Sequence, residues 1–163
     1  MKDNFSKQSL VYSKFRPQYP DEMIDYLISF VTNKSVALDI ATGNGQVAHK
    51  LSPFFETVDA IDISQSQFDN AIPGANIIYK IAAAENTTFK NKEFDLITVT
   101  QAIHWFDLDV FYKEIYRILK PDGTFSVLGY GLFSNNADSD TIIQDYYHNI
   151  VGPYWDAERK YLD

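Results

Sequence analysis

The stretch Leu38-Asp39-Ile40-Ala41-Thr42-Gly43-Asn44-Gly45-Gln46 decides the fold of this chain. The apolar run over residues 36–40, interrupted by one acid, is typical of a short buried strand. Gly43 and Gly45 remove side chains where the chain turns, so that backbone can lie against a ligand. A predicted helix begins at Gln46, and its free N–H groups point back toward that ligand. Strand, glycine turn and helix together indicate the opening of a nucleotide-binding βαβ unit.

Strand and helix patterns alternate along the rest of the chain. Apolar runs predict strands over residues 35–40, 57–62, 76–81, 94–100 and 124–130. Amphipathic stretches predict helices over residues 21–31, 46–52, 64–71, 107–119 and 141–150, with Asp21 as the first N-cap. Residues 120–123 should end a helix in a turn, and residues 135–140 should form a loop. We therefore predict the α/β class: a doubly wound, mostly parallel, Rossmann-like sheet with strand order 3-2-1-4-5.

Composition limits the functions that the chain can have. Its 163 residues are 45% hydrophobic and 15% aromatic, as expected for one folded domain. A formal charge of −8 disfavours nucleic acid and anionic membranes as partners. The absence of cysteine excludes disulfides and thiolate metal sites, and His49 and His148 have no partner at metal-ligand spacing. With no apolar leader and no membrane-spanning run, we expect a cytoplasmic protein without a metal.

The candidate site residues follow the predicted strands, because open α/β sheets bind ligands at the carboxyl ends of their strands. Asp39 and the glycine turn end the first strand, and Asp62 ends the second. A carboxylate such as that of Asp62 can accept both hydroxyl hydrogens of a ribose. Small residues over 82–84 would admit a flat base, with Glu85 beside them. The fourth strand runs into residues 100–106, which contain the candidate catalytic residue His104.

Several segments together resemble the class I S-adenosylmethionine-dependent methyltransferases. The similarity is greatest to the small-molecule branch that includes the trans-aconitate methyltransferases. The matching segments, in the order of that family, are Tyr12 with residues 15–20, residues 38–46, 61–64, 84–86, 94–97, 102–106 and 117–123. Each segment alone is common, whereas their joint order and spacing are specific.

The resemblance implies that S-adenosylmethionine is the cofactor and S-adenosylhomocysteine the product. Its cofactor-binding residues would be Tyr12, Arg16, Asp39, Ala41, Gly43, Gly45, Asp62, Ile63, Ala84, Glu85 and Gln101. Asp39, the glycines and Gln101 would hold the methionine portion. Asp62 would bind the ribose, and Ala84 and Glu85 would lie by the adenine. Residues 1–20 would form an N-terminal lid carrying Tyr12 and Arg16, and residues 21–163 the methyltransferase domain. His104 would lie beside the methyl-transfer face.

The chain departs from the family pattern at three places. Ala41 replaces the usual first glycine of the turn, and its methyl group should crowd the site slightly. Ala83 replaces an acid that binds the adenine amino group in many relatives, so main chain or Glu85 must do so. The sequence also stops at Asp163, where full-length members continue, so we expect a truncated chain that lacks the final antiparallel strands.

Other interpretations stay open. Gly43-x-Gly45-x-x-Ala48 also fits the dinucleotide fingerprint, so one alternative is an NAD-dependent oxidoreductase and another is an inactive cofactor-binding fragment. Glu85 could equally be a solvated loop acid, and His104 a packing residue beside its aromatic neighbours. Arg16 could be a surface ion-pair residue. We expect a small-molecule substrate, such as a carboxylate. A homodimer could form through the uncovered fifth strand.

Overall fold

The fold is described by a computed structural model, which covers residues 18–155. The chain divides into two compact units, one ending at Leu128 and the other beginning at Gly129. The first unit contains the five strands β1 to β5 and helices α2, α3, α4 and α5. Its elements are α2 (Asp21–Ile28), β1 (Val36–Ile40), α3 (Gln46–Leu51), β2 (Thr57–Asp62), α4 (Gln65–Phe68), β3 (Ile77–Ile81), β4 (Phe94–Thr100), η2 (Ile103–Trp105), α5 (Leu108–Ile118) and β5 (Leu119–Leu128).

The strands form one parallel sheet in the order β3-β2-β1-β4-β5, which confirms the predicted topology. Asp39 of β1 lies opposite Ala60 of β2 on one side and opposite Thr98 of β4 on the other. The strand order reverses at β1, so the carboxyl ends of β1, β2 and β4 meet at one edge of the sheet. That edge is where an open α/β sheet binds its ligand.

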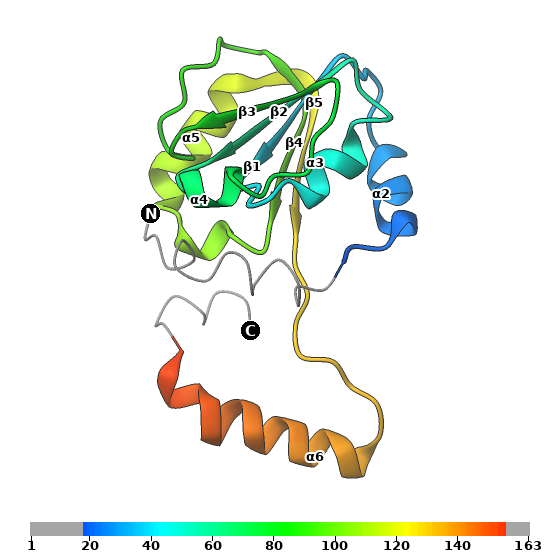
Figure 1. Ribbon diagram of the computed structural model, residues 1–163, viewed down its shortest axis with the longest axis vertical. Helices are drawn as coiled ribbons and strands as arrows, with labels where there is room; N and C mark the ends of the chain where they lie inside the picture. Colours follow the sequence, from blue (N-terminus) through cyan, green and yellow to red (C-terminus); the bar gives the residue numbers. More distant parts are fainter. Residues whose placement is uncertain (1–17, 156–163) are drawn as a thin grey trace. The chain divides into compact units, whose positions relative to one another are not determined.

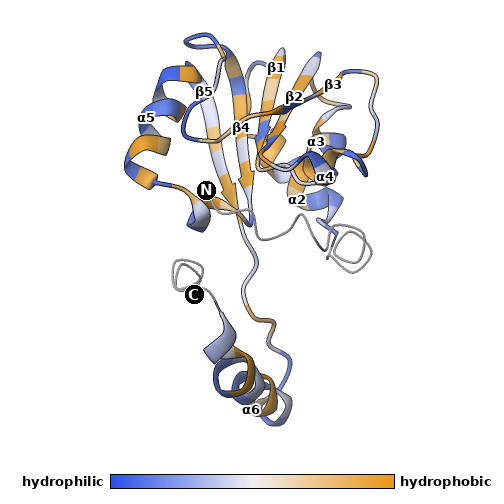
Figure 2. Cartoon of the chain, turned by 60° about the vertical axis from the view of Figure 1, so that its left-hand side comes forward, coloured by the Kyte–Doolittle hydropathy of each residue, from blue (hydrophilic) through white to orange (hydrophobic). Residues whose placement is uncertain are grey.

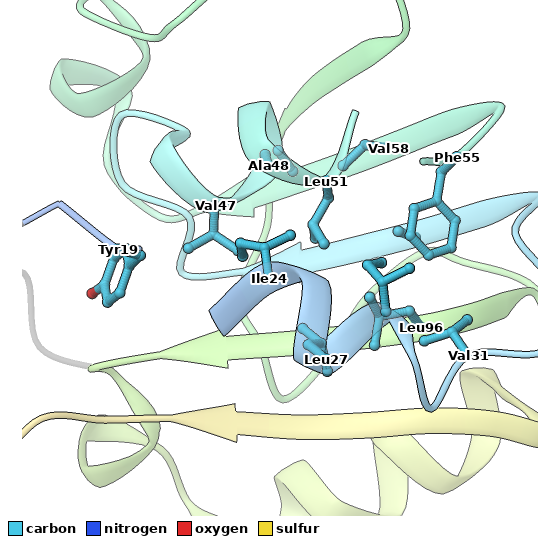
Figure 3. Close-up of a cluster of buried hydrophobic side chains, with 13 residues drawn as sticks. Tyr19, Ile24, Leu27, Val31, Val47, Ala48, Leu51, Phe55, Val58 and Leu96 are labelled. Carbon is cyan, nitrogen blue, oxygen red and sulfur yellow. The ribbon is translucent and has the colours of Figure 1, made fainter. Parts of the chain in front are cut away.

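Each face of the sheet is covered by helices (Figure 1), and both faces carry an apolar core (Figure 2). On one face, α2 and α3 pack on β1, β2 and β4 through residues that include Ile24, Val47 and Leu96 (Figure 3). On the other face, α5 packs through Phe111 and Ile115 against residues that include Ile97. Double coverage explains why β4 is buried along its whole length.

The fifth strand differs from its prediction. It begins at Leu119, directly after α5, and so includes the Pro-Asp-Gly segment that we expected to form a turn. The pairing is irregular there: β4 advances from Phe94 to Leu96 while β5 advances from Leu119 to Thr124. Residues 120–123 therefore bulge out of the ladder, which is how a strand accommodates a proline that lacks an N–H donor.

Helices α2 and α4 have other ends than predicted. Pro20 occupies the N-cap position of α2, so Asp21 lies inside the first turn and forms an ion pair with Lys50 of α3. Residues 29–31 continue α2 only as tighter turns, with Phe30 N donating to Leu27 O at 3.1 Å. The fourth helix spans only Gln65–Phe68. The predicted ends were wrong because hydrophobic periodicity locates an element better than it locates the boundary of that element.

The second unit is helical over most of its described part. It contains α6 (Ala137–Asp145), the π-helical segment η3 (Tyr146–Val151) and the short η4 (Gly152–Tyr154). The predicted loop over residues 135–140 was wrong in its second half, because Asn136 caps α6 by accepting from Ser139 N at 3.1 Å. Within residues 18–155, no helix combines the length and the apolar character needed to cross a bilayer.

Candidate functional site

Asp39 is the acid at the centre of the candidate site. Its side chain leaves the end of β1 on the face covered by α2 and α3, and it is almost completely buried. One carboxylate oxygen accepts from Thr42 Oγ1 at 2.6 Å and the other from Thr98 Oγ1 at 2.7 Å. A buried carboxylate needs such donors. The hydroxyls of the turn and of β4 therefore hold Asp39 in a defined orientation toward the edge of the sheet.

The glycine turn lies beside Asp39, and its two glycines adopt left-handed backbone conformations that other residues rarely adopt. Gly43 and Gly45 have φ values of 58° and 85°. A Cβ atom added at Gly45 would lie 2.0 Å from the Tyr79 hydroxyl, so no larger residue fits there. That hydroxyl donates to Ile72 O at 2.7 Å. Burial, together with the nearby Asp39 carboxylate, raises the pKa of Tyr79 to about 12, so the phenol stays protonated as a donor.

Ala41 lines the pocket and also has an unusual backbone conformation. Its φ is 53°, in the left-handed region that costs L-residues roughly 1–2 kcal/mol. Gln101, at the end of β4, has a similar φ of 55°. Strained non-glycine residues thus follow the two central strands at the same edge. Such strain persists where the surrounding structure enforces it, and it clusters at functional sites.

Asp62 connects the end of β2 to the glycine turn. One carboxylate oxygen accepts from Gly43 N at 2.9 Å, and the other accepts from Ser64 N at 2.9 Å. A carboxylate has about four acceptor positions, and these contacts use one on each oxygen. Ser64 occupies the N-cap position of α4, but its hydroxyl bonds to the Ser66 hydroxyl at 2.9 Å instead of the α4 backbone. Ile63, between the two, is half-buried.

A small pocket next to Asp39 contains two residues that the sequence analysis did not select. It is lined by Tyr19, Asp39, Ala41, Thr42, Gln46, Val47 and Thr100. Gln46 Oε1 and Thr100 Oγ1 are buried, and neither has a hydrogen-bond partner among residues 18–155. Buried acceptors without partners are rare, and each one calls for an explanation. Figure 3 shows Tyr19 near Val47, at the end of the core toward which the strands point.

Ala84 and Glu85 lie in the segment between β3 and β4. Ala82 N donates to Asp62 O at 3.0 Å, so this segment starts directly beside the second acid. Ala84 is buried. Glu85 is half-buried, and its Oε1 accepts from Asp107 N at 3.3 Å. The carboxylate of Glu85 thus contacts the start of α5, while the adjoining backbone stays at the edge of the sheet.

His104 lies in η2, just beyond the end of β4. The side chain is buried, and its ring centroid is 4.5 Å from that of Trp105. Gln101 precedes it and donates its N–H to Leu128 O at 2.9 Å. Both follow β4, the neighbour of β1 on the side opposite Asp62. The structure thus brings Asp39, the turn, Asp62 and the β4 end to one edge, whereas Tyr12 and Arg16 lie outside the described residues.

The donor and acceptor pattern of this edge fits a cationic group that carries several N–H donors. The pocket offers the Asp39 carboxylate and the two oxygens of Gln46 and Thr100, all of which can accept hydrogen bonds. Asp62 adds an acceptor suited to a sugar diol. No three His, Cys, Asp or Glu side chains are grouped for a metal ion in residues 18–155. The acceptors of the pocket thus suit an ammonium group, such as that of an amino acid.

Comparisons with known proteins agree with this geometry. Residues 38–127 match the family described as a methyltransferase domain. A Dictyostelium discoideum protein named as a methyltransferase is 39% identical over 99% of this chain and 63% of its own length. The Saccharomyces cerevisiae protein CRG1, named as an S-adenosylmethionine-dependent methyltransferase, is 29% identical over 76% of this chain and 45% of its own.

A solved structure supports the same assignment. The structure of a protein from Anaeromyxobacter dehalogenans, described as a type II methyltransferase, superposes on this chain with a TM-score of 0.81 and 33% identity. The match covers 91% of this chain and 63% of the Anaeromyxobacter protein. The chain thus spans less than two thirds of the relatives it matches. The family match covers the strand, turn and acid residues that build the site. The chain therefore belongs to the class I S-adenosylmethionine-dependent methyltransferases.

Proposed function

We propose that this chain binds S-adenosylmethionine and transfers its methyl group to a small-molecule acceptor such as a carboxylate, as in the trans-aconitate methyltransferase branch. The observation that carries the proposal is a pair of buried oxygens, Gln46 Oε1 and Thr100 Oγ1, which belong to residues lining the pocket of Asp39 and have no hydrogen-bond partner among residues 18–155. An α-ammonium group would satisfy these acceptors and offset the buried negative charge. Asp62 would accept from the ribose hydroxyls, and the Ala84 backbone would contact the adenine.

The same charges argue against the NAD-dependent alternative. A dinucleotide would place its anionic pyrophosphate at the glycine turn and the start of α3. In this chain the buried carboxylate of Asp39 adjoins that turn, whereas an acid at the position of Asp62 would suit the ribose of either cofactor. Anionic groups disfavour a pyrophosphate at that position and favour a ligand with positive charge.

The bound cofactor would supply a methyl group on a positively charged sulfur, a leaving group that needs no further activation. In the displacement, the acceptor forms a bond to the methyl carbon while the carbon–sulfur bond breaks, and both electrons of that bond stay on sulfur. The protein then has to align the two reactants and exclude water, which can lower a barrier by roughly 7–11 kcal/mol. Where the acceptor loses a proton, His104 is the candidate base, because histidine titrates near neutral pH.

Titration calorimetry tests the proposal. We expect S-adenosylmethionine and S-adenosylhomocysteine to bind and NAD not to bind. Asp62→Asn should weaken S-adenosylhomocysteine binding roughly 30-fold, because it removes a charged acceptor from the ribose. Asp59→Asn is the matched control: Asp59 lies on the same strand, is equally buried, and pairs with Lys80 at 2.5 Å. The Asp59→Asn variant should bind S-adenosylhomocysteine with wild-type affinity.

Three results would contradict the proposal. Binding of NAD with similar affinity would support the oxidoreductase alternative. Equal losses from Asp62→Asn and Asp59→Asn would show that the affinity depends on stability rather than on ribose contact. Binding without methyl transfer to any member of a panel of small carboxylates and amines would favour the alternative of an inactive cofactor-binding chain.

A further inference from the structure

We propose that Glu114 and Arg117 are positioning residues that determine how strongly the site selects adenine over other bases. They would do so by holding residues 82–93, here called the adenine segment, in place against α5. This inference rests on the proposed function, because that function assigns Ala84 and its neighbours to the base.

Glu114 and Arg117 contact the adenine segment through a dense set of hydrogen bonds. Glu114 Oε1 accepts from both the backbone N–H of Thr87, at 2.8 Å, and its hydroxyl, at 2.5 Å. Arg117 donates to both Glu114 oxygens, at 2.8 and 2.7 Å, in a forked ion pair. A second arm of the same guanidinium donates to Phe89 O at 2.8 Å and to Asn91 Oδ1 at 2.9 Å. Two side chains of α5 thus contact three residues of the segment.

The other end of α5 contacts the same segment. Asp107, its N-cap residue, donates its backbone N–H to Glu85 Oε1 at 3.3 Å. At the helix end, Lys92 N donates to Arg117 O at 2.9 Å. The adenine segment is therefore attached to α5 at both of its ends. The adenine segment itself contains only turns, irregular stretches and one isolated bridge, between Ala83 and Asn86.

A segment with little regular structure takes its position from such contacts. The α5 helix itself is fixed by its apolar face, which includes the fully buried Phe111 and Ile118. Glu114 is also buried, at 9% exposure, so its contacts are made away from bulk water, where charge-assisted hydrogen bonds are strong. Recognition of the adenine edge needs backbone donors and acceptors placed within fractions of an ångström. Loss of the Glu114 contacts should therefore relax base recognition and leave the methionine and ribose contacts in place.

The experiment compares two products that differ only in the base, S-adenosylhomocysteine and S-inosylhomocysteine. Inosine exchanges the amino donor of adenine for a carbonyl acceptor and the N1 acceptor for an N–H donor, so the ratio of the two dissociation constants reports base recognition alone. We expect wild type to prefer the adenosyl compound roughly tenfold, the equivalent of about one hydrogen bond. Glu114→Gln should reduce this ratio toward one, because glutamine lacks the charge and presents an amide donor in place of one carboxylate oxygen, to the donors of either Arg117 or Thr87.

Asp95→Asn is the matched control. Asp95 is a buried carboxylate that also accepts two hydrogen bonds from backbone N–H groups and pairs with a lysine, but it lies at the start of β4. It should destabilise the fold and leave the ratio at the wild-type value. Arg117→Lys provides a second variant if Glu114→Gln does not fold, because lysine keeps the charge and loses the fork.

Each outcome decides a different claim. A ratio that falls in Glu114→Gln or Arg117→Lys, and not in Asp95→Asn, supports the positioning role. An unchanged ratio in the folded α5 variants, an equal fall in the control, or a wild type without base preference would overturn it. A wild type that binds neither compound would instead overturn the proposed function, on which the inference rests.

Discussion

Two ends of the same sheet use buried carboxylates in opposite ways. At the amino end, one oxygen of Asp95 accepts from Ser35 N and Val36 N at 3.1 and 3.0 Å, and the other accepts from Lys120 Nζ at 2.8 Å. These contacts join the starts of β1 and β4 to β5. Although burial raises the pKa of Asp95, the hydrogen bonds from Lys120 and the two amides lower it below its usual value overall. This acid is a structural clamp.

At the carboxyl end, Asp39 and Asp62 accept from hydroxyl and backbone donors of the turn. They are as buried as Asp95, within a few percent of exposure. What differs is their surroundings, because Gln46 Oε1 and Thr100 Oγ1 lie in the Asp39 pocket without partners among the described residues. Burial of an acid therefore does not by itself indicate a ligand site. A ligand site is indicated when further acceptors beside the acid lack hydrogen-bond partners.

Removing the clamp should have the largest effect on stability. Asp95→Ala leaves two backbone N–H groups and the Lys120 ammonium without their acceptor, so we expect a loss of about 3 kcal/mol in the free energy of unfolding. Urea denaturation measures the loss. Affinity for S-adenosylhomocysteine under folding conditions should not change. A variant that retains stability but loses affinity would contradict the division between the two ends.

Low pH should reduce the stabilisation that ion-paired carboxylates give to the fold. The hydrogen bonds from Arg117, opposed by burial and aided by those from Thr87, lower the pKa of Glu114 from 4.5 to about 2. A pKa depressed in the folded state stabilises the protein above pH 4.5, and this stabilisation is lost as the pH falls toward 2. We expect a loss of roughly 2 kcal/mol from this group. Unfolding measured between pH 5 and 3 in wild type and Glu114→Gln should show a shallower pH dependence in the variant.

Thr100→Val should separate binding from stability at the carboxyl end. Replacing a partnerless buried hydroxyl by a methyl group should leave stability unchanged or raise it by up to about 1 kcal/mol. The same change should weaken S-adenosylhomocysteine binding roughly tenfold. Thr98→Val is the control, because the Thr98 hydroxyl donates to Asp39 at 2.7 Å and its loss should lower stability as well as affinity. A clear destabilisation by Thr100→Val would mean that its hydroxyl serves the fold.

The smallest effect is expected at Ala41. Glycine at this position would relieve the cost of a φ of 53° but would lose more backbone entropy on folding. We therefore expect Ala41→Gly to raise the free energy of unfolding by less than about 1 kcal/mol. Thermal denaturation can measure this, with Gly45→Ala as the opposite change. Gly45→Ala should destabilise strongly, because its Cβ would overlap the Tyr79 hydroxyl.

Some of the site was readable from sequence and some was not. Asp39, Gly43, Gly45 and Asp62 stood out because they lie at the ends of predicted strands or in the turn that follows one, and strand ends converge in a parallel sheet. Gln46 and Thr100 were missed because each reads as an ordinary residue of its helix or strand. Their role depends on the absence of a hydrogen-bond partner, which no local pattern encodes. The signal that could have found Thr100 is its place on the same face of β4 as Thr98.

The sequence by itself determined the order of strands and helices, the parallel sheet and the strand-end acids. It could do so because hydrophobic periodicity and turn residues act over a few neighbouring positions. Only the tertiary structure decided that Pro121 lies in a bulge of β5, that Tyr79 excludes a side chain at Gly45, and that Asp95 is a clamp. Each of these depends on a partner many residues away, whose position is set by sheet register and packing rather than by local sequence.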